Sequence, residues 1–116
     1  MNGHLIPKCH LWTLEPLTRD DIFRSIEVIR TFEEDSHFSR RLVRCCACGQ
    51  LYLKEFYEEI DWESGDDPQY VTFIPVRDEA NAVEVNTLNS LGLLSVRPSI
   101  RVDHPKGMPL TVKRLL

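Results

Sequence analysis

Four cysteines are the residues of this 116-residue chain best suited to chemistry, and two of them have the spacing of a metal-binding turn. Cys45 and Cys48 form a C-x-x-C motif that is followed directly by Gly49. Glycine lets the backbone turn tightly enough for two thiolates to face one metal ion, as in a zinc knuckle. The motif therefore predicts one half of a structural zinc site.

The second half of such a site must come from elsewhere in the chain. A structural zinc ion takes four Cys or His ligands at about 2.0 to 2.3 Å. Cys9 is the best third candidate, so the predicted metal ligands are Cys9, Cys45 and Cys48. We expect Cys9 and His10 to diverge, because the side chains of adjacent residues seldom bind one ion. The histidines that could complete the set are His4, His10, His37 and His104.

Two other interpretations of the cysteines stay open. The first is that they are buried thiols without a ligand, a common state for cysteine in reduced proteins. The second is redox chemistry, in which a C-x-x-C motif opens a helix whose dipole lowers the thiol pKa. Here the motif joins two expected strands, which disfavours a redox role. Cys46 should point away from its neighbours and into the core.

The sequence contains no catalytic signature, which predicts a protein that is not an enzyme. No cysteine has a family-specific catalytic context, and no glycine-rich phosphate loop is present. The carboxylates around Glu58 lack the alternating ligands and the glycine of a calcium loop. We expect them to form a solvated face.

Charge is distributed unevenly along a chain with a net charge of −4. Residues 51–84 hold ten acidic and two basic side chains, whereas residues 85–116 hold five basic and one acidic. An acidic surface that carries aromatic side chains suits a basic protein partner, because aromatic residues dominate binding hot spots. We therefore expect a protein-binding module, in one version an inhibitor or immunity protein for a basic toxin or nuclease. The expected contact residues are Glu55, Tyr57, Glu58, Glu59, Asp61, Trp62, Glu63, Asp66, Asp67 and Tyr70.

The alternative function is a nucleic-acid-binding protein similar to a zinc ribbon. Arg40, Arg41 and Arg44 form a small basic cluster that the basic C-terminal region could extend. Phosphate contacts dominate such binding, so the negative net charge argues against this alternative.

The elements that must position these residues fit a single α+β domain over residues 1–116, with an antiparallel sheet and two helices. Residues 4–16 read as extended. Thr18, with Asp21 three residues later, predicts a helix that runs to about residue 34. Asp78 predicts the N-cap of a second helix that continues through Leu91 and stops at Gly92.

The remaining segments predict strands. Residues 42–46 and 51–60 should form a hairpin with the C-x-x-C motif at its turn, although helix is a competing prediction for 51–60. Tyr52 and Phe56 should share one face of the second strand, opposite Leu51, Leu53 and Tyr57. Residues 70–74 form the clearest strand, residues 94–102 a strand interrupted at Pro98, and residues 110–116 a short edge strand.

The C-x-x-C-G turn that leads into an aromatic, acidic strand resembles a group of small bacterial proteins of unknown function. The likeness covers roughly residues 42–76 and supports the hairpin without implying an activity. The N-terminal residues lack the apolar core of a signal peptide, so we expect a cytoplasmic protein.

Overall fold

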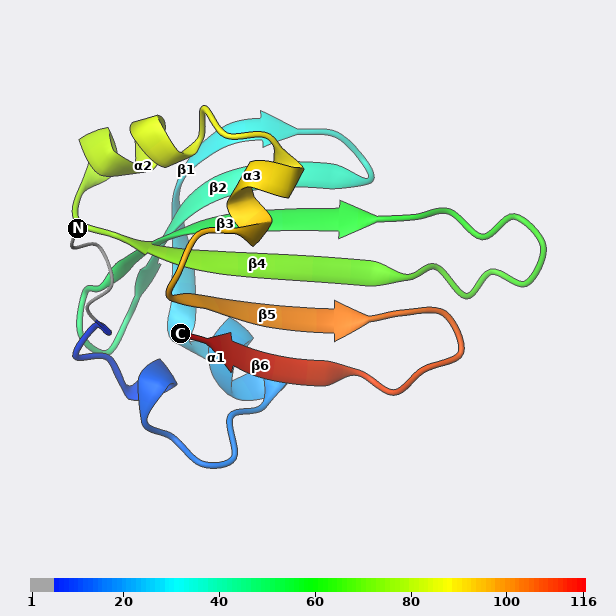
Figure 1. The fold of residues 1–116 in the computed structure, drawn as a ribbon, viewed down its shortest axis with the longest axis horizontal. Coiled ribbons are helices and arrows are strands. Elements are labelled where there is room, and N and C mark those ends of the chain that lie inside the picture. The colour runs from blue at the N-terminus through cyan, green and yellow to red at the C-terminus, as the bar shows by residue number, and fades with distance from the viewer. Residues whose placement is uncertain (1–5) are drawn as a thin grey trace.

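A six-stranded antiparallel sheet forms the centre of the structure, a computed structural model that describes residues 6–116 (Figure 1). The strands lie in the sheet in the same order as in the sequence, so each pairs with its neighbours along the chain. They are β1 (Ile26–Glu34), β2 (Phe38–Cys45), β3 (Leu51–Glu58), β4 (Gln69–Val76), β5 (Ser99–His104) and β6 (Thr111–Leu115).

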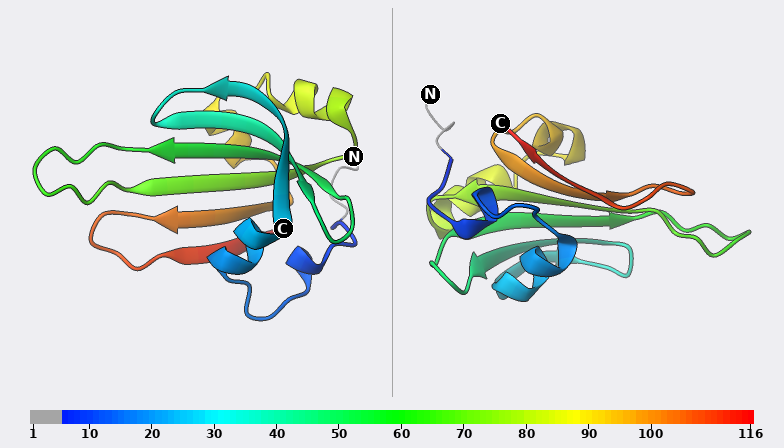
Figure 2. Two further views of the ribbon diagram at one scale, coloured as in Figure 1. Left: turned by 180° about the vertical axis from the view of Figure 1, so that it is seen from behind. Right: turned by 90° about the horizontal axis from the view of Figure 1, so that it is seen from below.

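Each face of the sheet is covered by a different part of the chain (Figure 2). On face A, Val43, Tyr52 and Phe73 pack against the N-terminal segment, which contains the 3-10 helix η1 (His10–Trp12) and the helix α1 (Arg19–Ser25). On face B, Leu53 and Ile74 pack against the helices α2 (Glu79–Val85) and α3 (Ser90–Leu94). The chain therefore has three layers and two apolar clusters.

The β2–β3 hairpin confirms the prediction made from the C-x-x-C motif. The two strands pair from Phe38 with Tyr57 to Arg44 with Leu51, which excludes the competing helix over 51–60. Tyr52 and Phe56 belong to the face A cluster and Leu53 to the face B cluster, as the alternation of a strand requires. The expected strand at 70–74 lies within β4 and the expected edge strand at 110–116 contains β6.

The predicted long helix over 18–34 is wrong beyond Ser25. Thr18 and Asp21 do form a reciprocal capping box, but α1 ends at Ser25 and β1 begins at Ile26. Residues 26–34 contain several β-branched side chains, which favour a strand, and β2 supplies their backbone partners. Two register shifts interrupt this pairing, so β1 is an irregular strand that bends across the sheet (Figure 1).

The second predicted helix is two helices. Asp78 caps α2 as expected, but α2 ends at Val85, and Asn89 caps α3 by accepting a hydrogen bond from the Gly92 backbone N–H. Gly92 is therefore inside α3 and does not end a longer helix. The expected strand over 94–102 begins only at Ser99, after Pro98. The α+β class holds, with more strand and shorter helices than expected, and no helix within residues 6–116 is long and apolar enough to cross a membrane.

A buried ion pair stabilises the packing of α2 and α3 on face B. Arg40 of β2 donates from Nε and Nη2 to a carboxylate oxygen of Glu55 at 3.1 and 2.9 Å. Arg40 Nη1 also donates to the carbonyls of Asn86 and Leu88, and the Ser90 hydroxyl donates to Glu55. Both charged side chains are less than one-tenth exposed. The pair thus joins two central strands to the connection between α2 and α3.

Replacing Glu55 by alanine is expected to lower the free energy of unfolding by about 3 kcal/mol or more, because the buried Arg40 charge loses its counter-ion. Chemical denaturation measures the change. Glu59→Ala is the matched control, since Glu59 is exposed and should change stability little. Equal stability of the two variants would show that the ion pair does not hold the helices on face B.

Candidate functional site: a cysteine and histidine centre

Two cysteines and one histidine that are distant in the sequence meet at one end of face A. The ligand atoms of Cys9, His10 and Cys45 all lie within 4.8 Å of one another. Cys9 and Cys45 are buried and His10 is partly buried. Soft thiolate and imidazole donors at this separation could hold a metal ion.

Cys9 and His10 converge because the chain turns between them. Cys9 is the extended N-cap of η1, with φ −135° and ψ 140°, whereas His10 already belongs to the 3-10 helix. This change of backbone direction lets both side chains reach Cys45 at the end of β2. The expectation that adjacent residues would diverge is wrong here, since it neglected a helix start between them.

The turn that begins at Cys45 favours the ionised form of the Cys45 thiol. Gly49 adopts φ +84° and donates its backbone N–H to the Cys45 carbonyl at 2.8 Å, which closes the turn. Burial alone would raise the pKa of the Cys45 thiol. Hydrogen bonds, with the backbone N–H groups of Ala47 and Cys48 as the main donors, lower this pKa by a larger amount. The net effect is a lowered pKa, so the turn is organised to stabilise a thiolate.

Cys48 is the fourth candidate ligand. It is exposed and lies outside the group of three, but it is close enough to affect the pKa of both Cys9 and Cys45. Cys46, by contrast, is exposed and its thiol faces Glu27 at 3.6 Å. The prediction that Cys46 is a core residue is therefore wrong, because Cys45 takes the inward position at the end of β2.

A second layer of hydrogen bonds orients His10. The Ser25 hydroxyl donates its single proton to the Asp21 carbonyl at 2.6 Å, so its oxygen accepts from His10 Nε2 at 3.1 Å. This arrangement assigns the imidazole proton to Nε2. Nδ1 then presents a free lone pair to Cys45 Sγ, 3.8 Å away. Metal-binding histidines are commonly oriented in this way by a partner on the other ring nitrogen.

A similar chain of donors ends at Cys9. Trp12 Nε1 donates to the Tyr52 hydroxyl at 3.0 Å, and Tyr52 in turn acts to lower the pKa of the Cys9 thiol. Burial nevertheless dominates and raises the pKa of Cys9 to about 11. A metal ion would be needed to ionise Cys9 at neutral pH.

Two of the other histidines lie elsewhere. His37 pairs with Glu58 at 3.2 Å, and His104 lines a separate cavity. His4 is outside the described residues. Of the predicted ligands Cys9, Cys45 and Cys48, the structure brings Cys9 and Cys45 together, and it selects His10 from the candidate histidines.

The predicted contact residues divide into structural and exposed groups. Glu55 is buried against Arg40, and Asp61 binds Lys106 at 2.7 Å and accepts hydrogen bonds from the backbone of Glu63 and Ser64. Glu58 accepts from Gln69, and Asp67 accepts from the Asp61 backbone N–H. Tyr57 and Tyr70 stack at 6.2 Å on face B. The exposed members beyond β3 are Glu59, Trp62, Glu63 and Asp66.

The three arginines proposed for nucleic-acid binding do not form one surface. Arg40 is buried with Glu55, and Arg44 pairs with Glu27 at 2.8 Å. Arg41 is adjacent to Arg40 on β2 and so points to the opposite face of the sheet.

Comparisons with protein families, with curated proteins and with solved structures found no match for this chain. The likeness to small bacterial proteins therefore stays a prediction, and the geometry of the site is the basis for its interpretation.

We expect cobalt(II), added to protein freed of metal, to produce thiolate charge-transfer absorption. Ser25→Ala should weaken cobalt binding about tenfold, because His10 loses the acceptor that fixes its ring. His10→Ala should weaken it further, and His37→Ala is the control outside the centre. Absorption that is unaffected by both Ser25→Ala and His10→Ala would exclude His10 as a ligand.

Proposed function

We propose that the centre binds one structural zinc ion through Cys9, His10, Cys45 and Cys48. Three cysteines and one histidine are a common ligand set for structural zinc, and they leave no open position for a substrate. The convergence of Cys9, His10 and Cys45 within 4.8 Å is the observation that carries this proposal. The hydrogen bonds of Cys45 and His10 described above support it, since they orient ligands that metal binding requires.

The ion would fasten the N-terminal segment to the sheet. Cys9 and His10 precede Leu11 and Trp12, both buried on face A, whereas Cys45 and Cys48 belong to the β2–β3 turn. Zinc would thus join two segments about forty residues apart in the sequence. Its binding energy would contribute to the stability of the folded state.

Removal of zinc by a strong chelator is expected to lower the melting temperature. A loss of about 3 kcal/mol corresponds to roughly 10 °C or more for a chain of this size. Elemental analysis should find one zinc ion per chain, and Cys45→Ser should abolish both the zinc and the chelator effect. Cys46→Ser, one residue away and exposed, should preserve both. Protein without stoichiometric metal and with an unchanged melting temperature would contradict the proposal.

For the biological role, we propose a non-enzymatic domain that binds a basic protein through the hairpin tip, residues 59–68. Trp62 carries this proposal, because it is 89% exposed at a position that joins β3 to β4. Figure 1 draws this connection extending beyond the ends of the neighbouring strands. An exposed tryptophan is a typical anchor of a protein interface.

The charges around Trp62 favour a basic partner. Glu59, Glu63 and Asp66 are exposed on the same connection, whereas Asp61 is already paired with Lys106. The Asp61–Lys106 pair connects the hairpin tip to the turn between β5 and β6. The tip is thus partly ordered before binding, which would reduce the conformational entropy lost when a partner binds. An inhibitor or immunity protein that covers the basic site of a toxin or nuclease is one version of this role.

Trp62→Ala is expected to abolish enrichment of a basic partner from an extract of the source cells. Leu91→Ala is the control, since Leu91 is 75% exposed but lies on α3. Partners bound through the tip should also be lost at high ionic strength, because salt screens exposed charges. Partners retained equally by wild type and Trp62→Ala, or retention of the protein on heparin, would contradict this role.

A further inference from the structure

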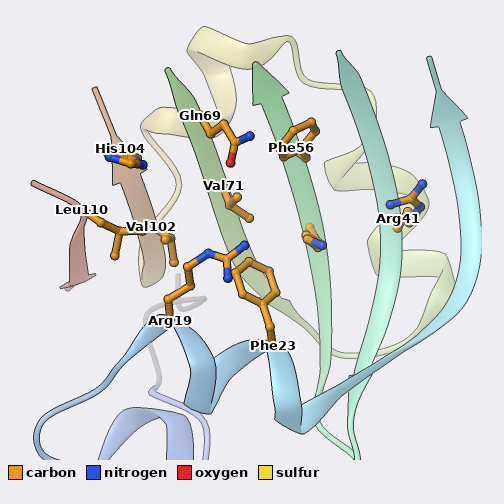
Figure 3. Close-up of a pocket in the computed structure, with 10 residues that line it drawn as sticks. Arg19, Phe23, Arg41, Phe56, Gln69, Val71, Val102, His104 and Leu110 are labelled. Atoms are coloured by element: carbon orange, nitrogen blue, oxygen red, sulfur yellow. The ribbon is translucent and has the colours of Figure 1, made fainter. Parts of the chain in front are cut away.

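A cavity of about 330 Å³ lies on face A, between the sheet and α1, apart from the cysteine and histidine centre (Figure 3). Arg19 and Phe23 of α1 form one side of it, and Val71 and Val102 belong to the sheet (Figure 3). Arg41 and Lys54, from β2 and β3, line it as well. Its volume is within the range of small-molecule sites.

Basic side chains dominate the charge of this cavity in a protein that is acidic overall. Lys54 is half-buried, and no carboxylate within residues 6–116 lies at ion-pair distance from it. Burial, followed by the charges of Arg41 and Arg19, lowers the pKa of Lys54. The two arginines each have a carboxylate nearby: Glu34 binds Arg41 at 3.1 Å, and an Asp20 oxygen lies 4.0 Å from Arg19. Lys54 is therefore the cation of the cavity that lacks such a partner among the described residues.

One aromatic side chain contacts two of the cations. Phe23 has the Arg19 guanidinium 4.4 Å from its ring centroid and the Lys54 ammonium 4.9 Å from it. The face of the ring partly compensates both charges but supplies no hydrogen-bond acceptor. Phe56 and Val71 add apolar surface to the same cavity. The cavity thus combines the unpaired Lys54 ammonium and two nearby guanidinium groups with an apolar wall.

We propose that this cavity binds an organic phosphate that carries an aromatic or other apolar group. Its phosphate would accept hydrogen bonds from Lys54, Arg19 and Arg41, which suits a doubly charged anion better than a single carboxylate. Its apolar group would contact Phe23 and Phe56. The negative charge of the ligand would neutralise the positive side chains, which otherwise repel one another in a half-buried site.

Titration with phenyl phosphate, followed by amide NMR shifts and calorimetry, tests the proposal. We expect saturable shifts in α1 and β3 and weaker binding of inorganic phosphate and of benzoate. Lys54→Met, which keeps most of the side-chain volume, should weaken phenyl phosphate binding about tenfold or more. Its melting temperature should not fall, because the substitution removes a desolvated charge that is repelled by its neighbours.

Arg19→Gln provides a second variant, with the same expected loss of binding. Arg24→Gln is the matched control, because Arg24 lies on the same helix, pairs with Asp21 and does not line the cavity. The absence of saturable shifts at low-millimolar phenyl phosphate would overturn the proposal. So would equal binding by wild type, Lys54→Met and Arg19→Gln, or binding of benzoate as tight as that of phenyl phosphate.

Discussion

The contact between the N-terminal segment and the β2–β3 turn is the constraint on which the rest of face A depends. The segment that contains η1 and α1 is the only described layer over the buried side chains of that face, and few backbone hydrogen bonds tie it to the sheet. Cys9 and His10 at its start meet Cys45, and Ser25 at the end of α1 hydrogen-bonds His10. The backbone carbonyl of Ser25 also accepts a hydrogen bond from the backbone N–H of Cys46 at 2.7 Å. Both ends of the segment are therefore held at one corner of the sheet, and the cavity beside α1 depends on that placement.

Face B is held by a different kind of interaction. Arg40 and Glu55 are buried between the sheet and the connection of α2 to α3, where Arg40 also donates to two backbone carbonyls and Glu55 accepts from Ser90. Such a pair adds little net stability compared with apolar residues, but it restricts where the helices can lie, because any other placement leaves a charge unpaired. A chain of this size can bury only a limited apolar area. Polar contacts therefore help to hold the covering layers: the cysteine and histidine cluster on face A and the ion pair on face B.

Local signals predicted the parts of the fold that depend on neighbours in sequence. The β2–β3 hairpin, the Thr18 and Asp78 caps, and the alternation of Tyr52 and Leu53 all follow from short-range chemistry. The end of α1 did not, because apolar residues beyond Ser25 fit a helical period as well as a strand, and pairing with β2 decides between them. The convergence of His10 with Cys9 was not predicted either, since a 3-10 turn between adjacent residues leaves no clear pattern in sequence. The arginine and lysine side chains of the basic cavity come from α1, β2 and β3, so only the folded chain reveals it.

X-ray absorption at the zinc edge most directly tests the proposed binding of one zinc ion by Cys9, His10, Cys45 and Cys48. We predict that the ion is surrounded by three sulfur atoms at about 2.3 Å and one nitrogen atom at about 2.0 Å. Cys46→Ser should leave this shell unchanged, whereas His10→Ala should remove the nitrogen contribution. A shell of oxygen and nitrogen atoms alone, or a spectrum that Cys9→Ser does not alter, would contradict the account.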